Sequence, residues 1–250
     1  MGRRSGGGEL LIMLAARIQE ARPFALSDIP GMVAWFTPRA LIGYSDGEAV
    51  GTWPNASGRG PDAVQATAGK RPIYKPNVYN GKAVLRFTRG NGHRMTSAMA
   101  EISQPITVFA VFKLASLSGM LTSYIFDSND VTESKRQYIF HYSYNWKFYA
   151  PCSAGDITGE VAPPYGPVIW CITFNGVNSY IWINGVKLFG PASFYVYTMN
   201  GLSIGAASSD AGFWDGDIGE IIVFNAALTD TNRKLIEAYL GTEYGIAVTP

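Results

Sequence analysis

The fold is indicated most directly by Ser179-Tyr-Ile-Trp-Ile-Asn184, followed by Gly185 and by Val186-Lys-Leu-Phe189. Side chains alternate along the first segment, so that Tyr180 and Trp182 share one face of an extended chain and the two isoleucines share the other. The Asn-Gly pair at its end suits a two-residue hairpin turn, in which both central residues take φ > 0. The stretch therefore predicts two antiparallel strands joined by a tight turn.

Similar segments recur on both sides of this hairpin. They are short runs rich in Val, Ile, Tyr, Phe and Trp, separated by turn residues. These runs are Met32–Phe36, Ala83–Phe87, Ile106–Lys113, Ser123–Asp127, Gln137–Tyr142, Val168–Asn175, Leu202–Gly205 and Asp217–Asn225. So many strands with almost no helix predict an all-β antiparallel sandwich or jelly roll.

Composition narrows the classes of partner. Lys plus Arg is 20 and Asp plus Glu is 19 in 250 residues, a net charge of +1. Such a chain has no field that would favour nucleic acid or an anionic membrane, so we expect neither partner. The chain has two Cys and two His, so we expect neither a structural zinc site nor catalysis by histidine. The length suffices for one large β domain or two small ones.

Residues 1–28 form a separate extension before the sandwich. Its apolar residues recur at spacings of three and four, which predicts an amphipathic helix that ends at Pro23. The stripe consists of Leu10, Leu11, Leu14 and Ile18. The apolar run is short for a signal peptide and lacks a persuasive cleavage site, and a membrane span needs roughly 20 apolar residues.

The apolar stripe of this extension must be buried against another apolar surface. It either packs on its own domain or docks on a partner chain, and both possibilities stay open. Docking through Leu10, Leu11, Leu14 and Ile18 would make the chain an oligomer or part of a larger assembly.

A helical period returns once near the C-terminus. Thr229 is placed to cap a helix whose apolar stripe consists of Leu235, Ile236, Tyr239 and Leu240. Gly241 is the expected stop. We predict one short helix that lies against the sandwich.

Several segments together carry a resemblance to a known family. They are Ile29-Pro-Gly-Met-Val-Ala-Trp-Phe36, Trp53-Pro-Asn-Ala-Ser-Gly58, Arg71-Pro-Ile-Tyr74, Asn80-Gly-Lys-Ala-Val-Leu-Arg-Phe87, Gly216-Asp-Ile-Gly-Glu-Ile-Ile-Val-Phe-Asn225 and Tyr244-Gly-Ile246. This set resembles the concanavalin A-like, laminin-G-like module, with departures at Pro54-Asn55, where the family usually has Asp, and at Glu243, where it usually has Lys. The resemblance implies a jelly-roll β-sandwich over residues 29–250.

The resemblance is less specific for function. Such modules occur in lectin-like surface proteins, beside polysaccharide hydrolases, and on bacteriophage tails and capsids. Related sandwich glycosidases place paired carboxylates on one strand, and the nearest match is Asp215-Gly-Asp217-Ile-Gly-Glu220. Strict alternation puts Asp217 and Glu220 on opposite faces unless a bulge intervenes. We therefore expect that the chain is not an enzyme.

An aromatic run is the candidate for a glycan-binding surface. Every even position from Tyr138 to Phe148 is aromatic. Flat rings stack on the apolar faces of sugars, although part of this run could equally be the core face of a hairpin. The candidates nearest the expected tip are Tyr142, Tyr144 and Trp146, with Trp214 as a further candidate in a Gly-flanked loop.

Two further features leave alternatives open. Asp127, Asn129 and Asp130 follow a strand end and could supply oxygen ligands for calcium, although Asp and Asn also favour turns for local reasons. No other cofactor is expected. Cys152 and Cys171 could form a disulfide only if their segments are neighbours, and Cys171, inside a predicted strand, has the setting of an ordinary buried thiol.

These features together predict a binding or assembly module without catalysis. The leading setting is a phage virion, as a tail or capsid decoration that presents a lectin-like sandwich to a surface or a glycan. The alternative is a secreted or surface bacterial carbohydrate-binding protein, and a sandwich-type glycoside hydrolase is the third possibility.

Overall fold

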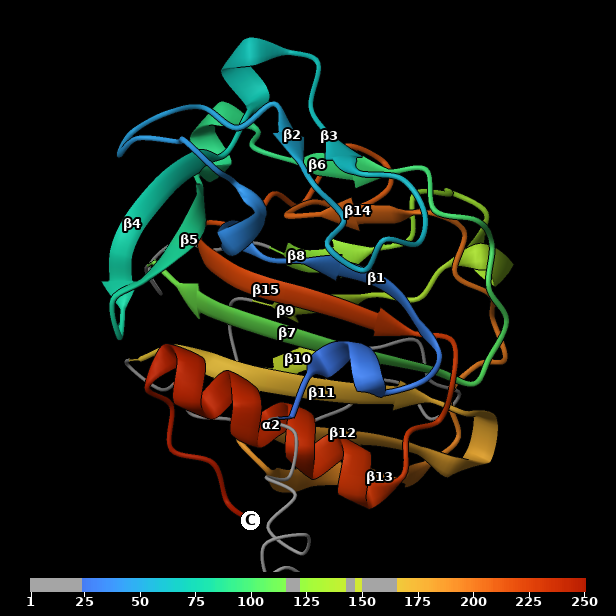
Figure 1. The fold of residues 1–250 in the computed structure, drawn as a ribbon. Coiled ribbons are helices and arrows are strands. Elements are labelled where there is room, and N and C mark those ends of the chain that lie inside the picture. The colour runs from blue at the N-terminus through green and yellow to red at the C-terminus, as the bar shows by residue number, and fades with distance from the viewer. Residues whose placement is uncertain (1–23, 116–121, 143–146, 150–165) are drawn as a thin grey trace, which may run out of the picture.

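The computed structural model describes residues 24–115, 122–142, 147–149 and 166–250. In this part of the chain two antiparallel sheets face each other, with one α-helix, α2 (Asp230–Tyr244), on the outer side of one sheet (Figure 1). The predicted class, an all-β antiparallel sandwich with a short C-terminal helix, is confirmed. No helix in the described segments is long and apolar enough to cross a membrane.

Within the described residues, eight strands form the sheet that carries α2, in the order β13-β12-β11-β7-β15-β5-β4, with β1 paired to β15. Their bounds are β1 (Met32–Phe36), β4 (Ile73–Tyr79), β5 (Lys82–Phe87), β7 (Ile106–Leu114), β11 (Val168–Phe174), β12 (Ser179–Ile183), β13 (Val186–Ala192) and β15 (Gly216–Phe224). Most of the predicted segments are recovered to within one or two residues.

The described part of the other sheet has seven strands in the order β10-β9-β8-β14-β6-β3-β2. They are β2 (Thr52–Trp53), β3 (Ala63–Val64), β6 (Met95–Ser97), β8 (Ser123–Asp127), β9 (Ile139–Tyr142), β10 (Lys147–Tyr149) and β14 (Leu202–Ile204). These strands are shorter, and several are joined by loops and single turns of 3-10 helix. Strands β2, β3, β4 and β6 were not predicted from the sequence; β2 and β3 have two residues each, which carry no detectable alternation.

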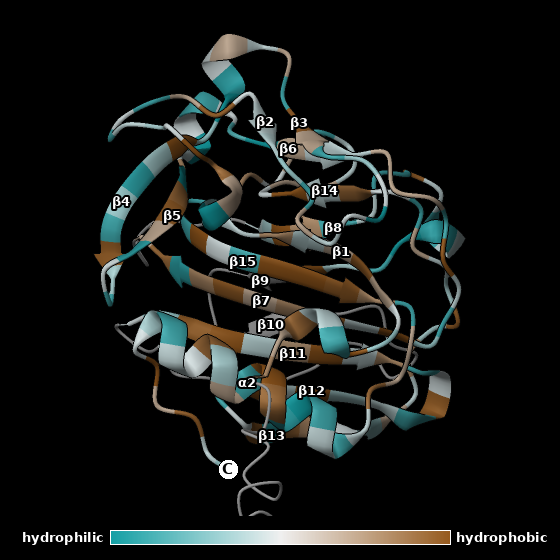
Figure 2. Ribbon diagram, viewed as in Figure 1, coloured by the Kyte–Doolittle hydropathy of each residue, from teal (hydrophilic) through white to brown (hydrophobic). Residues whose placement is uncertain are grey.

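The main core fills the space between the sheets. The rings of Phe112 and Trp214 meet there edge to face, with centroids 5.5 Å apart. Strands β7, β11 and β15 are buried nearly throughout, because one face contacts this core and the other lies under α2 and the N-terminal turn. Figure 2 shows these strands as the most apolar ribbons of the sheet. Burial on both faces explains their continuous apolar sequences.

A second apolar cluster lies on the outer face, where Ile236 and Leu240 of α2 pack against Phe109 and Ile222 of the sheet. The predicted helix on the sandwich is thus confirmed. Two details were wrong: Leu235 is 42% exposed, and Gly241 does not stop the helix.

The helix instead ends before Gly245, which has φ 66° and is the left-handed cap. Gly241 has a different reason to be glycine. A Cβ at Gly241 would lie 2.7 Å from Cγ2 of Val248 and 2.8 Å from the carbonyl oxygen of Ile246. The C-terminal tail therefore crosses the helix at this point.

The hairpin with which the sequence analysis began is formed as predicted. Asn184 and Gly185 have φ values of 50° and 81°. The carbonyl of Asn184 also accepts a hydrogen bond of 2.9 Å from the backbone N–H of Thr249, so the C-terminal tail covers the turn. This turn closes one end of the surface described next.

Candidate functional site

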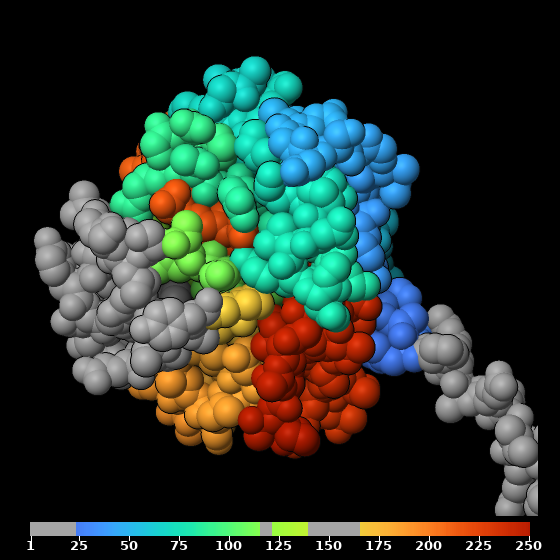
Figure 3. Space-filling view, turned by 90° about the vertical axis from the view of Figure 1, so that its left-hand side faces the viewer, coloured from blue at the N-terminus to red at the C-terminus, as the bar shows by residue number. Residues whose placement is uncertain are grey.

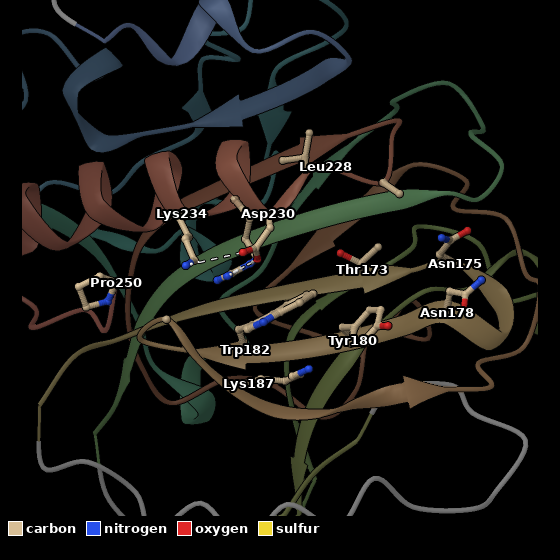
Figure 4. A pocket seen from close by; sticks show the side chains of 13 residues that line it. Thr173, Asn175, Asn178, Tyr180, Trp182, Lys187, Leu228, Asp230, Lys234 and Pro250 are labelled. Atoms are coloured by element: carbon tan, nitrogen blue, oxygen red, sulfur yellow. Dashed lines mark hydrogen bonds and ion pairs between the residues drawn. The ribbon is translucent and has the colours of Figure 1, made fainter.

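A groove lies on the outer face of the eight-stranded sheet, where α2 begins beside β11, β12 and β13. Its volume is about 590 Å³. Figure 4 shows that the strands form its floor and the first turn of α2 forms one wall. Figure 3 shows the C-terminal residues lying directly against the segment that contains these strands. The side chains that matter for its chemistry are Thr173, Asn175, Asn178, Tyr180, Trp182, Lys187, Asp230, Arg233 and Lys234.

Two aromatic rings form the floor of this groove. Alternation along β12 turns Ile181 and Ile183 toward the core and Tyr180 and Trp182 outward. The two outward rings have centroids 5.2 Å apart and planes inclined by 31°. Both are half-buried, so an edge or face of each stays accessible. We call this pair the aromatic platform.

Two cations adjoin the aromatic platform. The guanidinium carbon of Arg233 lies 4.7 Å from the centre of the Trp182 ring, and Nζ of Lys187 lies 5.5 Å from the centre of the Tyr180 ring. Both distances fall within the range of cation–π attraction. Arg233 is buried, whereas Lys187 is exposed. The platform is therefore fixed from the helix side and open on the side of Lys187.

A network of charges connects α2 with the floor. Arg233 donates hydrogen bonds of 2.6 Å and 3.1 Å to Oδ1 of Asp230 and a further one to Glu237. The hydrogen bonds from Arg233 lower the pKa of Asp230. Burial raises the pKa of Glu237 to about 7. Asp230 is exposed in the groove, while Glu237 is fully buried behind Arg233.

In the sequence, the shared face of Tyr180 and Trp182 indicates a strand and does not by itself indicate a binding site. The missing information was the position of α2, which supplies Asp230 and Arg233 from a segment far along the chain. The sequence did contain one indication of this site, because the two residues on the outward face of β12, Tyr180 and Trp182, are both aromatic. In the structure Trp182 also packs against the apolar cluster beneath α2, and both rings are half-buried.

The predicted aromatic candidates have a different outcome. Tyr144 and Trp146 lie outside the described residues, and of Tyr142 only the backbone is described, paired with Lys147. Trp214 was wrong as a glycan-binding residue, because its side chain is fully buried. Its ring packs against Phe112 between the sheets, where no sugar can reach it.

The residues considered for calcium are engaged by protein donors. Asp127 is buried and accepts a hydrogen bond of 3.2 Å from Nε of Arg136. Oδ1 of Asn129 accepts one of 2.9 Å from Arg94. Oδ2 of Asp130 accepts one from the side-chain amide of Asn200, and its Oδ1 accepts one from the backbone N–H of Thr132. In the described ranges, no three His, Cys, Asp or Glu side chains gather as a metal site would require.

The carboxylates of β15 lie elsewhere on the outer face. The register of β15 shifts between Ile218 and Ile221, and both of these residues point into the core. This bulge places Asp217 and Glu220 on the same outer face, which strict alternation would not do.

Each of these two carboxylates is bound by neighbouring side chains. Asp217 accepts hydrogen bonds from Nε of Arg86 at 2.7 Å and from the hydroxyl of Tyr79 at 2.7 Å. Glu220 is buried and accepts hydrogen bonds of 2.8 Å from Nε1 of Trp35 and 3.1 Å from Oγ1 of Thr37. Burial nevertheless raises the pKa of Glu220. These contacts tie β15 to β1, β4 and β5.

Other predicted residues fall on undescribed segments. Leu10, Leu11, Leu14 and Ile18 of the N-terminal stripe lie outside the described residues, as does Cys152. Cys171 is a fully buried free thiol on β11, and burial raises its pKa well above the ordinary value. The setting predicted for Cys171 is therefore confirmed.

Comparison with known proteins gives the class of fold. Over 89% of its length the chain resembles a sialidase from Trypanosoma rangeli, with a TM-score of 0.52 and 13% identity, and it spans 34% of that sialidase chain. It also resembles domain 4 of an extracellular arabinanase from Geobacillus stearothermophilus, solved in complex with arabinotriose. There the TM-score is 0.55 and the identity 14%, with 80% of this chain and 95% of that domain covered.

These similarities define an all-β sandwich of a kind that occurs in carbohydrate-acting proteins. No family model and no curated protein sequence matches the chain. The chain spans about a third of the length of the sialidase chains that it matches.

The similarities correct one expectation. From the sequence we expected that the chain is not an enzyme, but several of the solved structures that resemble it come from glycoside hydrolases. At this level of identity the likeness concerns the fold alone. The fold therefore gives no ground for excluding catalysis.

Proposed function

We propose that the protein binds carbohydrate in the groove above the aromatic platform. The observation that carries this proposal is the pair of outward rings, Tyr180 and Trp182, 5.2 Å apart on a solvent-facing strand. Sugars present apolar C–H faces that stack on such rings, and neighbouring polar groups then fix their orientation. The side-chain amides of Asn175 and Asn178 are placed at the end of the groove to donate and accept hydrogen bonds.

The platform is held in place before a ligand arrives. Its strand, β12, is hydrogen-bonded to β11 on one side and to β13 on the other. Arg233, itself held by Asp230 and Glu237, packs against the Trp182 ring. Rings that are already ordered lose little conformational entropy on binding, which favours affinity.

The comparisons support carbohydrate as the class of ligand. The arabinanase domain that resembles the chain was solved in complex with arabinotriose, and one of the sialidases was solved in complex with sialic acid. These are properties of those proteins. For this chain, membership of the laminin-G-like family stays part of the proposal and rests on the motifs from Ile29 to Ile246.

The biological setting is a finer part of the proposal. A virion decoration attached through Leu10, Leu11, Leu14 and Ile18 stays a prediction, with a bacterial surface or secreted protein as the alternative. Copurification of the chain with particles in many copies supports the first. Recovery only from the cell surface or the medium supports the second.

The test of carbohydrate binding uses the full chain on a glycan array, followed by titration of the best ligand. Tyr180→Ala and Trp182→Ala are each expected to weaken binding about tenfold, corresponding to about 1.4 kcal/mol per ring. The matched control is Tyr195→Ala, because Tyr195 is 42% exposed and its ring stacks on Tyr197 outside the groove. This control is expected to bind as the parent does.

The double variant Tyr180→Ala, Trp182→Ala tests whether the groove is the binding site. If it keeps the melting temperature of the parent and binds the same glycan equally well, the groove is not the binding site. If the double variant unfolds, Tyr180→Leu and Trp182→Leu retain bulk without a flat ring and give the same comparison. Release of reducing sugar is measured in the same samples, since the fold also occurs in glycoside hydrolases.

A further inference from the structure

The charges around the groove narrow the class of sugar, an inference that rests on the proposed function. Three cations line the groove, namely Lys187, Arg233 and Lys234. Among the lining residues that the structure describes, Asp230 is the only acidic side chain. The whole chain has a net charge of +1, so this local excess is not a reflection of a basic protein.

The carboxylate of Asp230 is already neutralised. Besides the two hydrogen bonds from Arg233, Nζ of Lys234 lies 3.7 Å from its Oδ2. Glu237 behind the groove offsets part of the charge of Arg233. The charges of α2 therefore largely compensate one another, and the two hydrogen bonds from Arg233 occupy Oδ1 of Asp230.

Lys187 is the cation that this network does not reach. Its side chain is exposed on β13 and forms no ion pair with an acidic group in the described part of the chain. Its ammonium lies 5.5 Å from the centre of the Tyr180 ring. Figure 4 shows Lys187 beside Tyr180 and Trp182, on the side of the platform away from α2. A sugar that covers Tyr180 must therefore lie beside this ammonium.

The start of α2 adds to the positive potential. The helix begins at Asp230, which lines the groove. A helix N-terminus carries a partial positive charge that favours nearby anions. The positive potential of the helix N-terminus adds to that of the Lys187 ammonium, and it would not be enough to bind an anion without Lys187.

We propose that the groove binds a sugar with an anionic substituent, its ring stacked on Tyr180 and Trp182 and its carboxylate or sulfate group paired with Lys187. A neutral sugar in this position would cover the ammonium without giving it a counter-ion. An anionic substituent at the edge of the ring offers a charge-assisted hydrogen bond instead. Because Lys187 is exposed, the pair contributes up to about 1 kcal/mol, which is about fivefold in affinity.

The experiment uses the full chain and matched saccharide pairs. Uronic acid oligosaccharides are compared with their carboxyl-reduced forms, and sulfated oligosaccharides with their desulfated forms, by titration at low and at physiological salt. The anionic member of a pair is expected to bind about three- to fivefold more tightly, with the difference shrinking as salt rises. Preference for the uronates alone or the sulfates alone identifies the anionic group.

Variants separate this inference from the proposed function. Lys187→Gln is expected to make the affinities for the anionic and the neutral member equal, whereas Lys187→Arg retains the preference. The matched control is Lys135→Gln, since Lys135 pairs with Glu101 on a different element. Tyr180→Ala should weaken binding of both members.

Each outcome has a definite meaning. Equal binding of charged and neutral members, or a preference that Lys187→Gln leaves intact, overturns the anionic inference while carbohydrate binding stands. Binding of anionic sugars that survives Tyr180→Ala and Trp182→Ala shows mere ionic association and also overturns it. Failure of every saccharide to bind overturns the proposed function itself.

Discussion

The guanidinium carbon of Arg233 lies 4.7 Å from the centre of the Trp182 indole ring. This contact joins α2 to β12, and it connects a buried charge network to the floor of the groove. Arg233 is 5% exposed and Glu237 is fully buried, so the pair is held in a poorly hydrated place. The stability of the helix and the geometry of the platform therefore depend on the same side chain.

Removal of Arg233 is expected to be costly, because it leaves the carboxylate of Glu237 buried without its cation. At about pH 8, where Glu237 is largely ionised, Arg233→Met should lower the free energy of unfolding by about 3–5 kcal/mol. The double variant Arg233→Met, Glu237→Leu should recover most of this loss. Urea denaturation measures both, and a double variant less stable than the single one would contradict the expectation.

Glu237 should also give stability a pH dependence. Burial raises its pKa to about 7 from an ordinary 4.5, so between these values the folded state holds a proton that the unfolded chain releases. This contribution is therefore complete below about pH 4.5 and is lost as the pH rises through 7, with a magnitude of up to about 3 kcal/mol.

The comparison with Glu237→Gln isolates this effect. The glutamine does not titrate, so the free energy of unfolding of the variant should fall less than that of the parent between pH values near 5 and 8. Other carboxyl groups, such as Asp210, have lowered pKa values and act in the opposite direction, but they are present in both proteins. Parallel pH profiles for parent and variant would show that Glu237 is ionised in both states.

Trp214 is expected to affect stability and not ligand binding. Its side chain is fully buried against Phe112, so Trp214→Ala leaves a large cavity between the sheets and should cost about 3–5 kcal/mol. Trp214→Phe fills part of this space and should cost less. Binding is measured on whichever variant remains folded, and a specific loss of glycan affinity at unchanged stability would contradict this assignment.

Gly241 should not tolerate even a methyl group. Alanine is intrinsically better in a helix than glycine by about 1 kcal/mol. Here, however, its Cβ would lie 2.7 Å from Val248 and 2.8 Å from the carbonyl of Ile246, so the tail must shift. Gly241→Ala is therefore expected to lower stability by about 1–3 kcal/mol. The control is Gly69→Ala, since no atom lies within 4 Å of a Cβ there. Thermal unfolding compares the two.

Local signals account for what could be predicted of this fold. The hairpin around Asn184 was predictable, because strand alternation and a positive-φ turn depend on residues that are neighbours in the chain. The cap at Thr229 was predictable for the same reason, since its hydroxyl accepts a hydrogen bond from the N–H of Asn232, three residues away. The end of the helix was not, because the tail that packs on Gly241 comes back from beyond it.

The candidate site was less accessible to prediction. The bulge in β15 that places Asp217 and Glu220 on one face arises from pairing with β7 and leaves no local pattern. The burial of Trp214 likewise depends on the sheet that covers it, whereas its Gly-flanked sequence resembles that of an exposed loop.

By itself, then, the sequence determined the all-β sandwich, its principal strands, its tight turn and the face on which Tyr180 and Trp182 stand, since short-range periodicity governs these features. Only the tertiary structure decided that this face is a groove, because α2 brings Asp230, Arg233 and Lys234 to it from far along the chain. Long-range packing also decided which aromatic residues are accessible. Burial depends on what covers a residue, and its immediate neighbours in the sequence do not specify that cover.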